Sequence, residues 1–138
     1  MRLRLFTDGG SRGNPGPSAY AFILQSDDGR TIMERAKFIG VATNNEAEYH
    51  GLLAGLAAAK EQGGDELEVT MDSELVVRQM QGIYDVKSPK LIPMHQEARL
   101  LFMSFRKPII VHARREHPVI TRADALLNEE LDTCTRRT

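Results

Sequence analysis

Residues 2–17 read RLRLFTDGGSRGNPGP and carry the first structural signals of the chain. Arg2–Thr7 alternates polar and apolar side chains, which is the pattern of a β-strand with one buried face. Asp8 follows directly, and the run of Gly, Asn and Pro after it predicts a loop. Sites in α/β folds form where strands end at such loops, so Asp8 is the first candidate for a functional residue.

The next two segments extend this first strand into a sheet. Ala19–Gln25 and Thr31–Ile39 are rich in β-branched and aromatic residues. The turn between them contains Asp28-Gly29, which is a strong hairpin signal. The beginning of the chain therefore predicts an antiparallel meander of three strands.

Helices and strands alternate in the rest of the chain. Asn44–Gln62 has apolar residues at helical spacing, with Asn44 as the predicted N-cap and Gly63 at its end. This order predicts an α/β fold, in which a mixed sheet is flanked by helices. The other predicted elements are helices over Ser73–Gln81, Leu91–Phe105 and Arg122–Thr133, and strands over Glu66–Met71 and Pro108–Ala113.

The composition is that of an ordinary globular domain. Of the 138 residues 41% are hydrophobic, and 18 basic and 19 acidic residues leave a formal net charge of −1. The one cysteine, Cys134, excludes an intrachain disulfide and a cysteine-based zinc site. The apolar runs are too short to span a bilayer. We expect a single cytoplasmic domain over residues 1–138, monomeric, without membrane contact and with a frayed tail over 134–138.

Four acidic residues stand at junctions between predicted elements. Asp8 and Asp72 follow strands, Glu48 lies about one turn into a helix, and Asp124 lies in the first turn of the last helix. Taken singly, each is typical of a turn residue or a helix-dipole partner. Brought together, four carboxylates would repel one another unless divalent cations lay between them, and oxygen ligands favour Mg²⁺ or Mn²⁺. Such ions would offset the charge of the acids, so a net charge of −1 does not exclude nucleic-acid binding.

Four segments carry a resemblance to a known family. They are DGGSRGNPGP (Asp8–Pro17), TNNEAEY (Thr43–Tyr49), MDSELVV (Met71–Val77), and RREH (Arg114–His117) with ADALLNEEL (Ala123–Leu131). In this order they resemble the motifs of type 1 ribonuclease H, the ribonuclease HI family. The resemblance implies the ribonuclease H fold, in which a five-stranded mixed sheet, made of the antiparallel meander plus parallel strands, is flanked by helices. It further implies an endonuclease that hydrolyses the RNA strand of RNA/DNA hybrids. It also implies two Mg²⁺ or Mn²⁺ ions per active site and products with 5′-phosphate and 3′-hydroxyl ends.

The resemblance also assigns the metal ligands. The family's glutamate falls three residues after the second Asn of TNN, which is Glu48 and not Glu46. Helix geometry agrees, because residues two apart point to different faces, whereas Glu48, Leu52 and Leu56 share one face. Glu46 is then a residue of the first helical turn. The implied metal-binding and catalytic acids are Asp8, Glu48, Asp72 and Asp124.

The glycine-rich loop and the TNN segment are implied to bind the hybrid. Their backbone groups and side-chain amides would read the ribose 2′-hydroxyl, which distinguishes RNA from DNA, or would hold phosphates. Structural roles remain open for three of them: a turn for Asn14, and helix capping for Thr43 or Asn44. The candidate substrate-binding residues are Gly10, Ser11, Arg12, Asn14, Thr43, Asn44 and Asn45.

His117 is a further candidate catalytic residue. It lies in the loop before the last acid, where many members of the family carry a mobile histidine that assists proton transfer or product release. This loop departs from the family pattern, since Pro118–Thr121 stands where an Asn is expected. A catalytic His117 and a plain surface histidine therefore both remain open.

A second departure concerns substrate affinity. Some members insert a basic, Trp-rich helix, but here Gln81–Lys90 leads directly into the next predicted helix, and the chain has no tryptophan. The sequence is thus most similar to the compact subgroup without this basic protrusion. Affinity would come from phosphate contacts that weaken with salt. The candidate cations are Arg12, Lys87, Lys90, Arg114, Arg115 and Arg122.

Three functions are compatible with these motifs. The first is cleavage of RNA/DNA hybrids, and the second is a non-cleaving module of the same fold that binds hybrids or structured RNA. The third is a related nuclease that prefers double-stranded RNA or DNA. The complete set of four acids favours cleavage, and Asn44 and Asn45 favour recognition of the 2′-hydroxyl.

Overall fold

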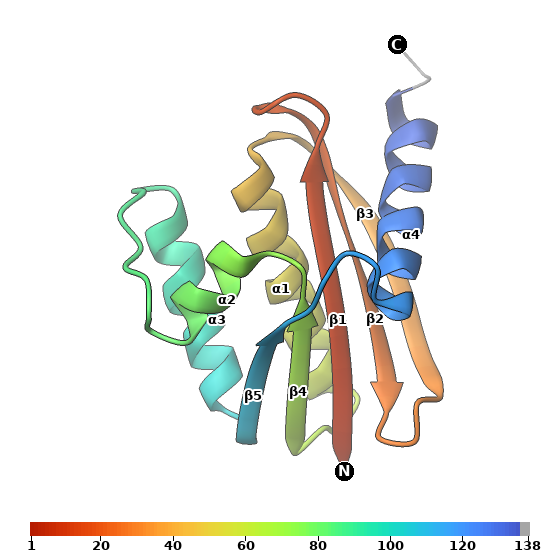
Figure 1. Ribbon diagram of the computed structural model, residues 1–138, viewed down its shortest axis with the longest axis vertical. Helices are drawn as coiled ribbons and strands as arrows, with labels where there is room; N and C mark the ends of the chain where they lie inside the picture. The colour runs from red at the N-terminus through yellow and green to blue at the C-terminus, as the bar shows by residue number, and fades with distance from the viewer. Residues whose placement is uncertain (136–138) are drawn as a thin grey trace.

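The computed structural model describes residues 1–135, and a five-stranded mixed sheet lies at its centre (Figure 1). The strand order is β3-β2-β1-β4-β5. β2 is antiparallel to β1 and β3, whereas β4 runs parallel to β1 and β5 parallel to β4. The predicted sheet is confirmed, with β1 between its antiparallel and parallel halves. The strands are β1 (Arg2–Ser11), β2 (Gly16–Ser26), β3 (Thr31–Ala42), β4 (Glu66–Met71) and β5 (Arg106–His112).

Helices cover both faces of the sheet (Figure 1). The residues of α1, α2 and α3 pack on one face in a main apolar core. α4 packs on the other face, over β1, β2 and β3, in a second apolar cluster. Side chains alternate along β1, so Leu5 belongs to the main core and Phe6 to the second cluster. The helices are α1 (Asn44–Glu61), α2 (Glu74–Met80), α3 (Leu91–Met103) and α4 (Pro118–Thr135).

Two element boundaries differ from the prediction and change the surroundings of the candidate acids. β1 continues to Ser11 because Gly9 and Gly10 still pair with β2, which shortens the predicted loop. α4 begins at Pro118, four residues before the predicted start, because proline is favoured in the first turn of a helix. Asp124 therefore lies in the second turn of α4, and its predicted place in the first turn is wrong.

The predicted frayed tail over 134–138 is only partly described. Cys134 and Thr135 complete α4, where the Thr135 hydroxyl donates to the Leu131 carbonyl at 2.6 Å. Residues 136–138 lie outside the described residues. The first two residues of the predicted tail are thus the last residues of α4, and fraying of this end stays a prediction.

The described residues contain neither a helical insertion between α2 and α3 nor a helix that could cross a membrane. Residues 81–90 join α2 to α3 without an intervening helix, as predicted. None of the described helices is both long enough and apolar enough to cross a membrane.

Gly9 allows α1 to lie directly against β1. A Cβ atom at this position would lie 2.5 Å from the Glu48 backbone nitrogen, and closer still to the backbone carbonyl of Ala47. These are backbone atoms of a buried helix, so they cannot turn aside as a flexible side chain would. The missing side chain at Gly9 therefore sets the separation between the strand that carries Asp8 and the helix that carries Glu48.

We predict that Gly9→Ala lowers the free energy of unfolding by about 3 kcal/mol or more, because the added methyl group must push α1 away from β1. Urea denaturation measures this loss. Gly10→Ala is the matched control, since its Cβ would meet its nearest neighbour, Leu127 Cδ2, at an ordinary 3.4 Å. Equal stability of the two variants would contradict this account of the packing.

Candidate active site

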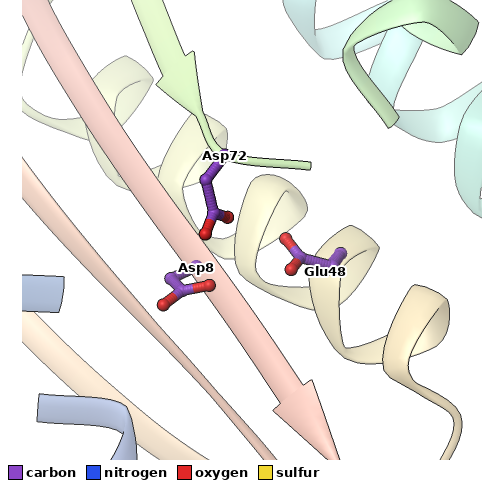
Figure 2. A group of neighbouring side chains, drawn as sticks. All are labelled: Asp8, Glu48 and Asp72. Carbon is purple, nitrogen blue, oxygen red and sulfur yellow. The ribbon is translucent and has the colours of Figure 1, made fainter. Parts of the chain in front are cut away.

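Three carboxyl groups from distant parts of the sequence meet at one end of the sheet. Figure 2 shows Asp8 on β1, Glu48 on α1 and Asp72 just after β4, with their carboxyl groups turned toward a common point. One oxygen of each group lies within 4.8 Å of an oxygen of the other two. Asp8 and Glu48 are each only 5% exposed, and Asp72 is partly buried. The structure thus brings together three of the four predicted acids.

The register of the parallel strands places the two aspartates side by side. Thr7 of β1 pairs with Met71 of β4, so the residues that follow them occupy equivalent positions on neighbouring strands. Ser73 then caps α2, because its hydroxyl accepts the N–H of Val76 at 3.3 Å. The chain therefore turns away immediately after Asp72, which leaves its carboxylate at the end of the sheet.

A capping box fixes the start of α1 and the direction of Glu48. The Thr43 hydroxyl accepts the Glu46 N–H at 3.2 Å, and the Glu46 carboxylate accepts the Thr43 N–H at 3.0 Å. The prediction of Asn44 as N-cap is wrong, because Thr43 has the extended backbone of a cap and the oxygen of Asn44 instead accepts the Ser11 N–H. Glu46 is a first-turn residue and Glu48 points inward, as predicted.

Asp124 approaches the same site from the opposite face of the sheet. It is partly buried on α4 and lines a cleft of about 380 Å³ together with the other three acids. It lies outside the tight group of three that meet within 4.8 Å. The structure thus places all four predicted acids in one cleft, with Asp124 on a separate wall.

Burial and mutual repulsion make these carboxyl groups hard to ionise together. Burial, with added repulsion from Asp72 and Asp124, raises the pKa of Asp8 to about 8, although the Gly9 N–H donates to it at 2.9 Å. Burial and the charges of Asp8 and Asp72 raise the pKa of Glu48 well above its usual range. Burial also raises the pKa of Asp72, against the opposing charge of Arg115. A cation placed among these oxygens would remove the repulsion.

The residues of the site fit a divalent metal ion. Among the described residues, Glu48 Oε2 is a buried oxygen without a hydrogen-bond partner, which is costly unless another ligand binds there. The converging donors are carboxylate oxygens, with no histidine or cysteine among the residues that line the cleft. Such a donor set suits Mg²⁺ or Mn²⁺ rather than Zn²⁺ or Cu²⁺.

The predicted substrate-binding residues form a hydrogen-bonded chain beside the acids. Asn44 links the two segments, since its side-chain oxygen accepts the Ser11 N–H at 3.1 Å and its own N–H donates to Asn14 Oδ1 at 3.0 Å. Gly10, Ser11, Arg12 and Asn44 line the cleft. The Arg12 guanidinium also contacts the Asp132 carboxylate at 2.7 Å, across to α4.

The remaining candidates line a second hollow next to the start of α1. Asn14, Thr43 and Asn45 face it together with Lys90, which comes from the segment before α3. Its volume is about 330 Å³. The predicted binding residues are thus divided between the acidic cleft and a neighbouring hollow that contains a cation.

His117 does not line the acidic cleft. Its Nδ1 accepts the Val119 N–H at 3.2 Å, its carbonyl accepts the Thr121 N–H at 2.8 Å, and its ring lies 5.4 Å from the ring of Phe6. These contacts cap the start of α4, as side-chain acceptors at helix N-termini do.

The sequence analysis missed one residue that lines the cleft and overestimated the number of cations that line it. Of the six candidate cations, Arg12 and Arg115 line the cleft, and Lys90 lines the second hollow. Arg122 is instead paired with Glu34. Asn128 was not predicted, although it lies four residues after Asp124 and thus one helical turn further along the same side of α4.

Comparisons with known proteins place the chain in a family. A family model described as "Reverse transcriptase-like" matches residues 6–129. The chain is 44% identical to Ribonuclease HI of Halobacterium salinarum over 131 residues, which is 95% of this chain and 65% of that protein. The chain belongs to the type 1 ribonuclease H family. It is also 42% identical, over 99% of its length, to a bifunctional protein of Mycobacterium tuberculosis, of which it covers 37%.

Solved structures of type 1 ribonucleases H share this fold throughout. RNase H1 of Halobacterium salinarum NRC-1 gives a TM-score of 0.91 at 43% identity, with 96% of this chain and 99% of that chain covered. The N-terminal RNase H domain of the Mycobacterium tuberculosis protein gives 0.92 at 41% identity, with 96% and 100% covered. LC11-RNase H1, isolated from compost and solved in complex with RNA/DNA hybrid, gives 0.89 at 40% identity, with 96% and 99% covered. The predicted family is therefore confirmed.

The raised pKa of Asp8 predicts a specific pH dependence of stability. A carboxyl group with a pKa of about 8 in the folded chain, against an ordinary 3.8, takes up a proton on folding between these two pH values. The folded state therefore loses stability as the pH rises from about 4 to about 8. In metal-free solution, Asp8→Asn should raise the melting temperature at pH 8 by on the order of 5 °C, and by less toward pH 4. Thermal unfolding in EDTA measures this difference.

The control for this experiment is Asp85→Asn, which changes an exposed acid and should have little effect. Added Mg²⁺ should stabilise the wild-type chain more than Asp8→Asn. An Asp8→Asn variant that gains no stability at pH 8 would show that the clustered carboxyl groups do not strain the folded state.

Proposed function

We propose that this chain is an endoribonuclease that hydrolyses the RNA strand of RNA/DNA hybrids and leaves 5′-phosphate and 3′-hydroxyl ends. The observation that carries the proposal is the convergence of Asp8, Glu48 and Asp72 within 4.8 Å, with Asp124 in the same cleft. Membership of the type 1 ribonuclease H family supports it, as does the 40% identity to LC11-RNase H1, which was solved with an RNA/DNA hybrid.

The four acids would hold two Mg²⁺ or Mn²⁺ ions. When bound, such ions supply a water of lowered pKa and stabilise the charge of the scissile phosphate and leaving oxygen. The acids supply the negative charge and fixed orientation that this requires. The unpartnered Glu48 Oε2 provides a buried ligand, and Asp124 provides one from an independent helix.

The asparagine chain leaves hydrogen-bond donors for the substrate. The Asn44 and Asn14 oxygens are occupied by backbone N–H groups, so their side-chain NH₂ groups can donate to a ribose hydroxyl or a phosphate. The Thr43 hydroxyl accepts the Glu46 N–H and can donate its own proton outward. With Asn45 and Lys90 in the same hollow, this donor set suits a phosphate of the DNA strand. Gly10, Ser11 and Arg12 line the cleft with the acids and would contact the RNA strand.

We further infer a role for His117, the state of the domain and its cellular location. We infer a capping role for His117, because its contacts with Val119 and Phe6 hold it at the start of α4; proton transfer would require it to leave them. We also infer that residues 1–138 act as a single domain, since the main core and the second cluster share β1, and that this domain is a monomer. We further propose that the chain acts in the cytoplasm, which is the location expected from its sequence.

We predict that the chain cuts the RNA strand of a labelled hybrid in Mg²⁺ or Mn²⁺ and leaves duplex DNA intact. Asp8→Asn and Asp72→Asn should each lower the rate by on the order of 100-fold or more, since each removes a metal ligand. Asp85→Asn is the control and should cut normally. Gel separation of the end-labelled products measures both rate and end chemistry.

Each alternative function has its own outcome in this experiment. Hybrid retention in EDTA without turnover in either metal would replace the proposal by a non-cleaving module. Faster cleavage of double-stranded RNA or DNA would replace it by a different nuclease. Hybrid cleavage that survives Asp8→Asn would contradict the assigned site.

A further inference from the structure

α4 is attached to the protein differently from the elements that carry the other three acids. β1, α1 and β4 share the main core, which also holds α2 and α3. α4 packs chiefly on β1, β2 and β3 through the second cluster. The position of Asp124 relative to Asp8, Glu48 and Asp72 therefore depends on how α4 is seated on the sheet.

The spacing of residues along α4 divides it into a core face and two polar sides. With 100° between successive residues, Asp124, Asn128 and Asp132 form a row on one side of the core face, whereas Arg122 and Glu130 lie on the other. The row with Asp124 lies along the cleft, which Asn128 also lines. The core face consists of Ile120, Ala123, Leu127 and Leu131.

The side of α4 away from the cleft is tied to the edge strand β3 at two points. Arg122 donates from Nε and Nη2 to the two carboxylate oxygens of Glu34, both at 3.2 Å. Two turns further on, the Phe38 N–H donates to Glu130 Oε2 at 3.0 Å. These two ties, together with the contacts of Arg12 with Asn128 and Asp132 on the cleft side, oppose rotation of α4 about its axis. Such a rotation would carry Asp124 toward or away from the remaining acids.

We propose that Glu34 and Arg122 are positioning residues, which set the approach of Asp124 to the other acids and thereby the affinity of the site for its second divalent cation. This rests on the proposed function. Neither residue lines the cleft, so both act through α4. The paired, planar geometry of the guanidinium and carboxylate fixes orientation, whereas a half-exposed ion pair adds little to stability. Its loss should therefore affect ion binding more than folding.

The experiment measures Mn²⁺ binding to the metal-free chain by electron paramagnetic resonance, without substrate. Glu34→Gln and Arg122→Gln should each lower the affinity for the second Mn²⁺ ion by about threefold or more. Their melting temperatures should stay within about 2 °C of wild type. Simple electrostatics predicts opposite effects, because one variant removes a negative charge and the other a positive charge. Arg122→Lys keeps the charge but not the paired contact, and should bind ions as Arg122→Gln does.

Two controls connect the effect to Asp124. Glu66→Gln removes the ion pair between Arg106 and Glu66 (3.3 Å) at the opposite end of β4 and should leave Mn²⁺ binding unchanged. In an Asp124→Asn background, Glu34→Gln should weaken Mn²⁺ binding no further, because the residue through which it acts is gone.

Wild-type affinity in both Glu34→Gln and Arg122→Gln would overturn the inference. So would a loss that persists in the Asp124→Asn background, or shifts of opposite sign in the two variants. A wild-type chain that binds no Mn²⁺ would instead overturn the proposed function on which the inference rests.

Discussion

Repulsion between carboxyl groups held in a small, buried volume is the constraint on which this structure depends. Asp8, Glu48 and Asp72 present oxygens within 4.8 Å of one another, and two of these residues are almost fully enclosed. Without a counter-charge, this arrangement favours protonated acids and weakens the fold, as the raised pKa of Asp8 indicates. The same arrangement suits divalent cations, because folding has already brought the ligands together.

The scaffold around the acids resists this repulsion from several directions. β1 lies centrally in the sheet and contributes to apolar clusters on both faces. Gly9 lets α1 approach β1 closely, and the capping box of Thr43 and Glu46 fixes where α1 begins. Together these features keep Glu48 close to Asp8, because Glu48 could move away only if α1 shifted on β1. Asp124 lies on a separate helix, α4, so its position relative to the other acids can change without any change in the packing of the main core.

The sequence predicted those parts of the site that local patterns determine. Strand alternation and helical spacing predicted that Asp8 and Asp72 follow strands and that Glu48 lies on a helix. The family resemblance assigned Glu48 rather than Glu46 as the ligand, and helix geometry agreed with that assignment. The order of the motifs predicted the family, which in turn gave the sheet its expected topology. Those signals lie within single elements, and this is why they could be read without a structure.

Three of the differences from the prediction arise from contacts between distant segments. Thr43 rather than Asn44 caps α1 because Asn44 is occupied by Ser11, which lies 33 positions away. The pairing of Glu34 with Arg122 spans 88 positions and has no local signature. β1 extends past its predicted end because its partner strand continues beside it, which propensity alone does not show.

Anomalous diffraction from crystals of the protein grown with Mn²⁺ and an uncleavable hybrid tests the proposed metal site most directly. We expect two manganese peaks among the carboxyl groups of Asp8, Glu48, Asp72 and Asp124, beside a phosphate of the RNA strand. Manganese bound elsewhere, or no manganese between these side chains while the hybrid occupies the cleft, would contradict it.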